Sequence, residues 1–141
     1  MSASTLLNRC EGVKQTRRGH WIAKCPSHDD RHPSLAIRQL DNGKILIHCF
    51  GGCTASEVLS AVGLSLEDLF PERQEGYTSA RERRPFFAAD ILRCISHEAL
   101  IVSIAALNVA KGVELSEEDR KRLLVAASRL QGATEVCNGD S

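Results

Sequence analysis

Four residues of the metal-ligand type stand in two close pairs, and they restrict the possible folds of this chain more than any other feature. Two residues separate Cys25 from His28, three separate Cys49 from Cys53, and twenty lie between the pairs. Zinc prefers four sulfur and nitrogen ligands in a tetrahedron, and ligand pairs of similar spacing commonly supply them. The spacing therefore predicts one structural zinc ion, with all four positions filled by the protein.

The segment between the two pairs predicts a β-hairpin. SLAIRQL and KILIHCF have the apolar patterns of strands, and the turn tripeptide DNG at 41–43 lies near the middle. HWIAKC predicts a strand before it, and the glycines at 51 and 52 would let the backbone turn back toward the metal. Three other histidines are rival ligands: His20, His32 and His48. His48 directly precedes Cys49, so on a strand it should point to the opposite face.

The rest of the chain has helical patterns. Residues 3–10 predict a short helix, and Thr54 predicts the N-cap of another. Residues 72–85 are polar and aperiodic, as linkers are. An apolar stripe from Ile91 to Val109 and a helix start at Ser116 then predict a helical hairpin. We therefore expect an α+β protein with a small zinc-ribbon sheet and short helices in residues 1–71, a linker at 72–85, and a helical hairpin at 86–137.

Size and charge limit the function. A chain of 141 residues suggests one domain, or a small domain with an appendage, and it leaves little room for a separate catalytic domain. No apolar run has transmembrane length and no secretory start is visible, so we expect a cytoplasmic protein whose clustered cysteines bind metal. Residues 1–53 carry eight Lys and Arg against four Asp and Glu. This excess predicts an anionic partner for the N-terminal part.

Three motifs carry a family resemblance. CPSHDD, HPSL and HCFGGC resemble the Cys-His-Cys-Cys zinc-binding domain of bacterial-type DNA primases, especially variants in phage and mobile-element primase-like proteins. The resemblance covers about residues 10–71. One departure is that many replicative primases have two residues, rather than three, between the last two cysteines.

The resemblance implies a role in DNA replication and primer initiation. In that family the zinc domain contacts single-stranded template, and a following domain, which we do not find here, performs polymerisation. We therefore expect a zinc-binding, single-stranded DNA-binding protein that is not an enzyme by itself. The candidate contacts are basic residues that could follow phosphates and aromatic residues that could stack on bases. They are Trp21, Lys24, Arg31, Arg38, Lys44, His48 and Phe50.

The helical hairpin allows an alternative function. The segment ALIVSIAALNVA at 99–110 is apolar on nearly every side, and one partner helix cannot cover such a surface. It must pack on the ribbon, on a second copy in a homodimer, or on a different protein. In the alternative, the zinc is purely structural and the helical hairpin docks a primase, a helicase or another replication protein. Twelve residues are too few to span a membrane.

Overall fold

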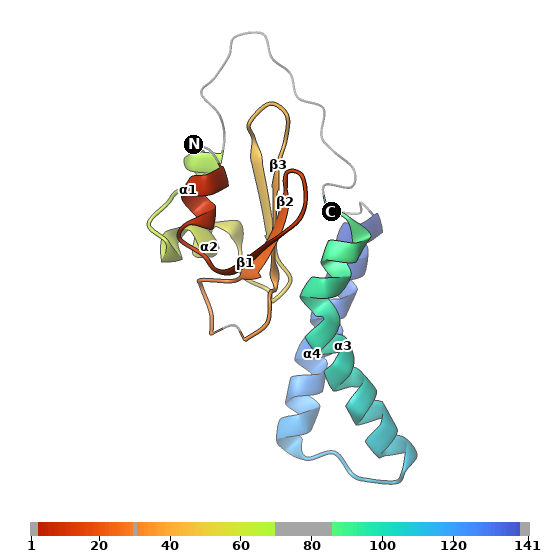
Figure 1. The fold of residues 1–141 in the computed structure, drawn as a ribbon. Coiled ribbons are helices and arrows are strands. Elements are labelled where there is room, and N and C mark those ends of the chain that lie inside the picture. The colour runs from red at the N-terminus through yellow and green to blue at the C-terminus, as the bar shows by residue number, and fades with distance from the viewer. Residues whose placement is uncertain (1–2, 30, 70–85, 139–141) are drawn as a thin grey trace.

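The computed structural model describes residues 3–29, 31–69 and 86–138, so the predicted linker at 72–85 lies outside the described residues. The predicted α+β class is confirmed, because a four-stranded antiparallel sheet is followed by a helical hairpin. In Figure 1 short helices lie on one side of the sheet and the helical hairpin lies on the other. We call residues 3–69 the ribbon.

The sheet is an antiparallel meander in which each strand pairs with the next along the chain. Its strands are β1 (Glu11–Arg17), β2 (His20–Lys24), β3 (Leu35–Gln39) and β4 (Ile45–Cys49). Ala36 is paired with Ile22 on one side and His48 on the other, whereas Ile37 is paired with Trp21 and Ile47. Because successive side chains of a strand alternate between faces, these two rows belong to opposite faces of the sheet.

The first face is covered by α1 (Ala3–Leu7), α2 (Ala55–Ala61) and the short 3-10 helix η1 (Leu66–Leu69). Leu6, Leu35, Ile37 and Leu59 are fully buried there and form the core of the ribbon. The helix predicted at 3–10 is shorter and ends at Leu7. The predicted cap of α2 is present, since the Thr54 hydroxyl accepts a hydrogen bond from the Glu57 backbone N–H at 3.2 Å.

The second face is covered by the helical hairpin of α3 (Ala88–Ala110) and α4 (Glu117–Asn138). A second buried cluster joins them: Ile22, Ala36, Phe50, Phe86, Ile91, Cys94 and Ala133. Ile91 is buried as its place in the apolar stripe predicts, but Val109 at the far end of the stripe is 56% exposed. Figure 1 shows the reason, because the outer part of the hairpin projects beyond the sheet. No described helix is long and apolar enough to cross a membrane.

The edge strand β1 was not predicted from the sequence. Six of its seven residues are exposed, and its pairing with β2 is interrupted by register shifts, so it has no regular apolar alternation. One polar contact ties it to the helical hairpin. The Thr16 hydroxyl donates to the buried Asp90 carboxylate at 2.8 Å, and the Arg93 guanidinium donates to its other oxygen at 3.0 Å. Asp90 thus connects the sheet edge to the first turn of α3.

Candidate metal centre

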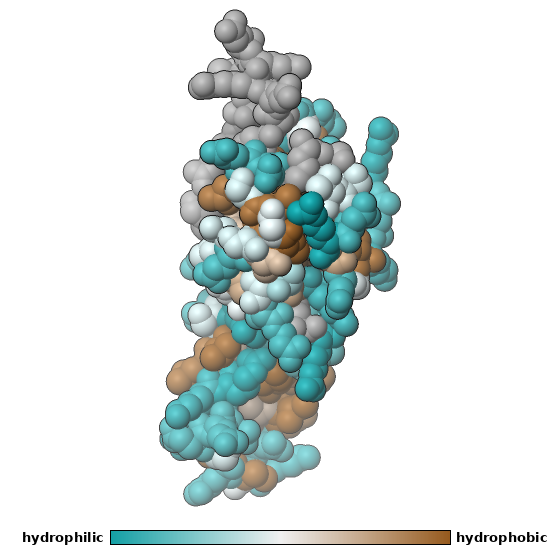
Figure 2. All heavy atoms as spheres, turned by 90° about the vertical axis from the view of Figure 1, so that its left-hand side faces the viewer, coloured by the Kyte–Doolittle hydropathy of each residue, from teal (hydrophilic) through white to brown (hydrophobic). Residues whose placement is uncertain are grey.

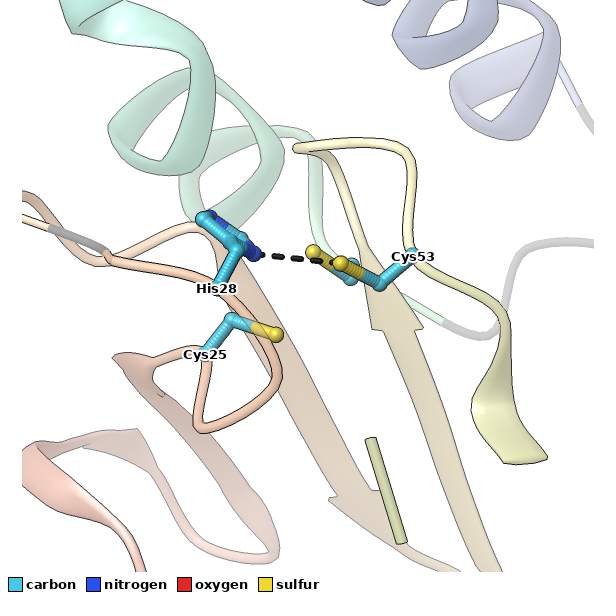
Figure 3. Close-up of side chains that lie close together, drawn as sticks. Cys25, His28 and Cys53 are labelled. Carbon is cyan, nitrogen blue, oxygen red and sulfur yellow. Dashed lines mark hydrogen bonds between the residues drawn. The ribbon is translucent and has the colours of Figure 1, made fainter. Parts of the chain in front are cut away.

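The two predicted ligand pairs meet at one end of the sheet. The four ligand atoms of Cys25, His28, Cys49 and Cys53 lie within 4.8 Å of one another. In tetrahedral zinc sites, with Zn–S near 2.3 Å and Zn–N near 2.0 Å, ligand atoms are separated by roughly 3.5–3.8 Å. Figure 3 shows Cys25, His28 and Cys53 converging, with the His28 Nδ1 atom 3.1 Å from the Cys53 sulfur. These four residues, which we call the metal centre, could hold a metal ion after small adjustments of these separations.

Local structure explains why the four residues converge. Cys49 is the last residue of β4, Cys25 directly follows β2, and Cys53 directly precedes the cap of α2. Leu35 pairs with Ala23 on one side and Cys49 on the other, so β3 holds the two strand ends next to each other. Cys25 and Cys49 are buried, whereas His28 and Cys53 are half-buried. The pair that is fixed by the sheet is therefore also the pair that is shielded from solvent.

Hydrogen bonds at the metal centre shift the pKa values of Cys25 and Cys49 in opposite directions. A hydrogen bond from the Cys25 thiol lowers the pKa of Cys49 to about 5, against the opposing effect of burial. The backbone N–H groups of Cys53 and Gly51 contribute in the same direction, and the Gly51 N–H lies 3.3 Å from the Cys49 sulfur. The same thiol–thiol hydrogen bond, together with burial, raises the pKa of Cys25. Since a metal binds the thiolate form, its arrival releases the Cys25 proton.

The two glycines at the end of β4 have different roles. Gly52 has φ +97°, a conformation that L side chains rarely adopt. Gly51 is required for a different reason, because its surroundings leave no room for a side chain. A Cβ atom placed on Gly51 would lie 2.8 Å from His28 Cε1 and 3.3 Å from the Cys49 sulfur. The backbone therefore passes so close to two metal ligands that only glycine fits there.

This close approach predicts the effect of Gly51→Ala. The added methyl group should push the His28 ring away from the three sulfurs, and we expect metal affinity to fall by roughly ten- to hundredfold, the range seen for altered ligand surroundings. Competition with a chromophoric zinc chelator measures the affinity. The matched control is Gly132→Ala in α4, where an added Cβ meets nothing within 4 Å. Equal affinities of the two variants would show that Gly51 does not shape the site.

None of the rival histidines joins the cluster in the described part of the chain. His48 lies on the opposite face, as predicted, with its ring centroid 4.5 Å from that of Phe50. Burial lowers the pKa of His48. His20 contacts Phe87 at 4.2 Å between ring centroids, and His32 stacks on His97 at 4.1 Å. Each rival imidazole is therefore held by an aromatic partner away from the metal centre.

The structure divides the predicted nucleic-acid contacts between the two ends of the sheet. Lys24 and Arg31 lie at the end that carries the metal centre, whereas Arg38 and Lys44 lie at the opposite end. The two turns of that opposite end are adjacent, because the Gln39 N–H donates to the Gly19 carbonyl at 2.9 Å. We call the four basic residues there the turn group: Arg17, Arg18, Arg38 and Lys44. Arg17 and Arg18 are exposed, whereas Arg38 and Lys44 are half-buried.

Phe50 does not fit the base-stacking role predicted for it. Its side chain is only 4% exposed and packs between the sheet and the helical hairpin. It could not stack on a base unless the hairpin left the sheet, so we assign Phe50 to the core. The half-buried Trp21 packs against the core of the ribbon and His48 faces the hairpin, so neither presents a fully open ring.

Sequence reasoning missed a buried ion cluster between the two long helices. Glu98, which is 6% exposed, accepts hydrogen bonds from Arg122 at 2.8 Å and from Arg129 at 2.7 Å. The other carboxylate oxygen of Glu98 lies 2.7 Å from Arg122 Nη1 in an ion-pair contact. Glu98 directly precedes the apolar segment of α3 at 99–110, and the two arginines lie two helical turns apart on α4. That pattern could have indicated the cluster.

This cluster should make stability depend on pH. Burial tends to raise the pKa of Glu98, but the hydrogen bonds from Arg122 and Arg129 outweigh it and lower the pKa. A lowered native pKa stabilises the fold above the ordinary glutamate pKa, and the contribution is lost as the pH falls through the native value. The arginine side chains are 37% and 28% exposed, so we expect only about 1–2 kcal/mol.

The measurement is chemical denaturation of wild type and Glu98→Gln at several pH values. Because acid also displaces metal from both proteins, the difference between them isolates the carboxylate. The difference should be present at pH 7 and should shrink below pH 4.5. A difference that stays constant with pH would contradict the ionised state of Glu98.

The chain matches no family model, no curated protein and no solved structure. The resemblance to primase zinc domains therefore rests on the quoted motifs.

Proposed function

We propose that the chain binds one zinc ion at the metal centre and uses the ribbon to bind single-stranded DNA in primer initiation. The convergence of three cysteines and one histidine supports zinc, because thiolate and imidazole ligands suit this ion and oxygen-preferring ions such as Mg²⁺ do not use them. Four protein ligands leave no position for water or substrate. The ion is thus structural. In this proposal the chain acts together with a primase and is not itself the polymerase.

Charge supports an anionic partner for the ribbon. The turn group gathers four cations at the end of the sheet opposite the metal centre. Strands of five residues separate the two ends by roughly 16 Å, at about 3.3 Å per residue. Three thiolates on Zn²⁺ give the metal centre a net charge of about −1. The turn group lies far from that negative charge, so it is the part of the ribbon best suited to phosphates.

This proposal predicts the effects of Arg38→Ala and Lys44→Ala. Each change removes one phosphate contact, so affinity for single-stranded DNA should fall for every sequence alike, by about 1 kcal/mol per contact. The dependence of log affinity on log salt should become shallower by about 0.7 for each lost contact. Fluorescence anisotropy with a labelled oligonucleotide at several salt concentrations measures both quantities.

The matched control is Lys121→Ala, which removes an exposed cation from α4 outside the ribbon. It should leave DNA affinity unchanged within error, and none of the three variants should release zinc. If Lys121→Ala weakened binding and the two ribbon changes did not, the turn group would not be the DNA-binding surface.

One observation favours the alternative role as an adaptor. The outer part of the helical hairpin exposes large apolar side chains, including Leu100, Ile104 and Leu107 on α3 and Leu124 on α4. Figure 2 shows brown apolar surface on the lower part of the molecule, where the hairpin projects. Clustered exposed apolar residues commonly mark protein interaction sites. If wild type binds no oligonucleotide at low salt, docking of a replication protein by this surface becomes the better proposal.

A further inference from the structure

A hollow of about 250 Å³ lies between the metal centre and the helical hairpin. The loop after His28 forms one wall, the end of β4 forms the floor, and α3 and α4 form the other wall. Figure 3 shows α3 passing beside His28 at this place. Pockets for whole small molecules are commonly about 300–1,000 Å³. This hollow therefore fits a single functional group better than a complete nucleotide.

The charged groups around the hollow are mainly basic. Arg31 and His32 come from the ribbon, His97 comes from α3, and Arg122 and Arg129 come from α4. Among the described residues, the carboxylates are those of Asp29 and Glu98. The three guanidinium groups face two carboxylates and the metal centre, whose zinc-loaded form carries about −1, so they offset the negative charge even when both imidazoles are neutral. Recognition of an anion here therefore depends on directed guanidinium hydrogen bonds rather than on an excess of positive charge. A bound anion could also accept hydrogen bonds from the ring N–H groups of His32 and His97.

Glu98 positions the two α4 arginines without using all their donors. Two guanidinium groups have ten N–H donors, whereas one carboxylate offers about four acceptor positions. Arg122 and Arg129 keep 37% and 28% of their side-chain surface exposed. The ion cluster therefore holds both guanidinium groups in fixed orientations, and each can still donate hydrogen bonds to a further group in the hollow. Guanidinium groups held in this way suit planar, bidentate contacts with oxyanions.

We propose that this hollow binds a phosphomonoester group, with Arg31, Arg122 and Arg129 donating to its oxygens. A terminal phosphate has one covalent connection and can enter a small hollow end-on, whereas an internal phosphodiester would need room for the chain on both sides. The group could belong to the 5′ end of a nucleic-acid strand or to a small phosphorylated molecule. The site does not depend on DNA binding by the turn group, which lies at the other end of the sheet.

The test uses the zinc-loaded full chain in a phosphate-free buffer of constant ionic strength. Inorganic phosphate is titrated while NMR follows the imidazole signals of His32 and His97. We expect saturable shifts in both residues. Arg31→Gln should weaken phosphate binding at least fivefold, and His97→Gln provides a second variant in the same hollow. The control Arg120→Gln removes an exposed cation from α4 and should stay within twofold of wild type.

Two oligonucleotides that differ only in a 5′ phosphate distinguish the two candidate ligands, a strand end and a small phosphorylated molecule. Tighter binding of the phosphorylated strand, with the gain lost in Arg31→Gln, would identify a strand end as the ligand. Equal binding of the two strands, together with Arg31-dependent phosphate binding, would identify a small phosphorylated molecule. Phosphate that leaves His32 and His97 unshifted, or that binds equally to Arg31→Gln and Arg120→Gln, would overturn the proposal. Binding of the unphosphorylated strand tests the proposed single-stranded DNA binding by itself. Failure of that proposal can therefore be told apart from failure of the proposed phosphomonoester site.

Discussion

Removing the metal should unfold the ribbon. Structural zinc contributes roughly 10–16 kcal/mol to the folding of small zinc domains, which is as large as the whole stability of a typical domain. Here the metal centre holds together the end of β2, the end of β4 and the start of α2. Loss of the metal therefore releases all three segments from one another at this point. Trp21 is the single tryptophan of the chain and packs against the ribbon core. Chelation should therefore shift its fluorescence to longer wavelength.

Matched cysteine variants provide the control for metal removal. Cys25→Ser removes a ligand and should give the unfolded spectrum even when zinc is added. Cys10→Ser makes the same chemical change at a half-buried residue outside the metal centre. It should keep both the metal and the native spectrum. An apoprotein with unchanged Trp21 emission would mean that the ribbon core suffices for folding and that the metal has another purpose.

The second large effect is expected for Phe50→Ala, which should separate the helical hairpin from the sheet. Phe50 lies in the cluster that joins Ile22 and Ala36 of the sheet to Ile91 and Cys94 of α3. Removing a buried phenylalanine side chain typically costs about 3–5 kcal/mol. Because this cluster forms the interface, hydrogen exchange in β2 and β3 should accelerate as well. Denaturation followed by circular dichroism measures the loss of stability.

Two comparisons make this result specific. Leu124→Ala removes an apolar side chain that is 72% exposed, so its effect should stay within about 0.5 kcal/mol. Phe50→Leu keeps an apolar side chain in the interface and should preserve both most of the stability and the DNA affinity. If Phe50→Leu lost DNA binding without losing stability, Phe50 would be a base-stacking residue after all. Equal stabilities of Phe50→Ala and Leu124→Ala would mean that the hairpin does not dock in solution.

The parts of the fold with strong local signals could be predicted from the sequence. The turn tripeptide at 41–43 lies between two apolar strands, Thr54 caps α2, and the ligand spacing anticipated the convergence at the metal centre. β1 was missed because six of its seven residues are exposed, and its stability comes from pairing with β2 rather than from an apolar pattern. The local sequence does not encode that pairing.

The sequence was a better guide to the strand or helix that carries a side chain than to the neighbours of that side chain in the folded protein. His48 was placed correctly on a strand, yet the sheet face that it occupies is the one that the helical hairpin covers. Nothing in the sequence specifies which face the hairpin packs against. The same reason explains why the contacts of Glu98 with Arg122 and Arg129 were missed, since they require two helices to be brought into register.

Elemental analysis of the full chain, purified without chelators, tests the central claim most directly. We predict one zinc ion per wild-type chain, full retention in Cys10→Ser, and loss from Cys25→Ser. Single-stranded DNA affinity measured on the same wild-type preparation should decline when the zinc is removed. A wild-type preparation without stoichiometric metal, or a Cys25→Ser variant with as much zinc as wild type, would contradict the assignment of the metal centre.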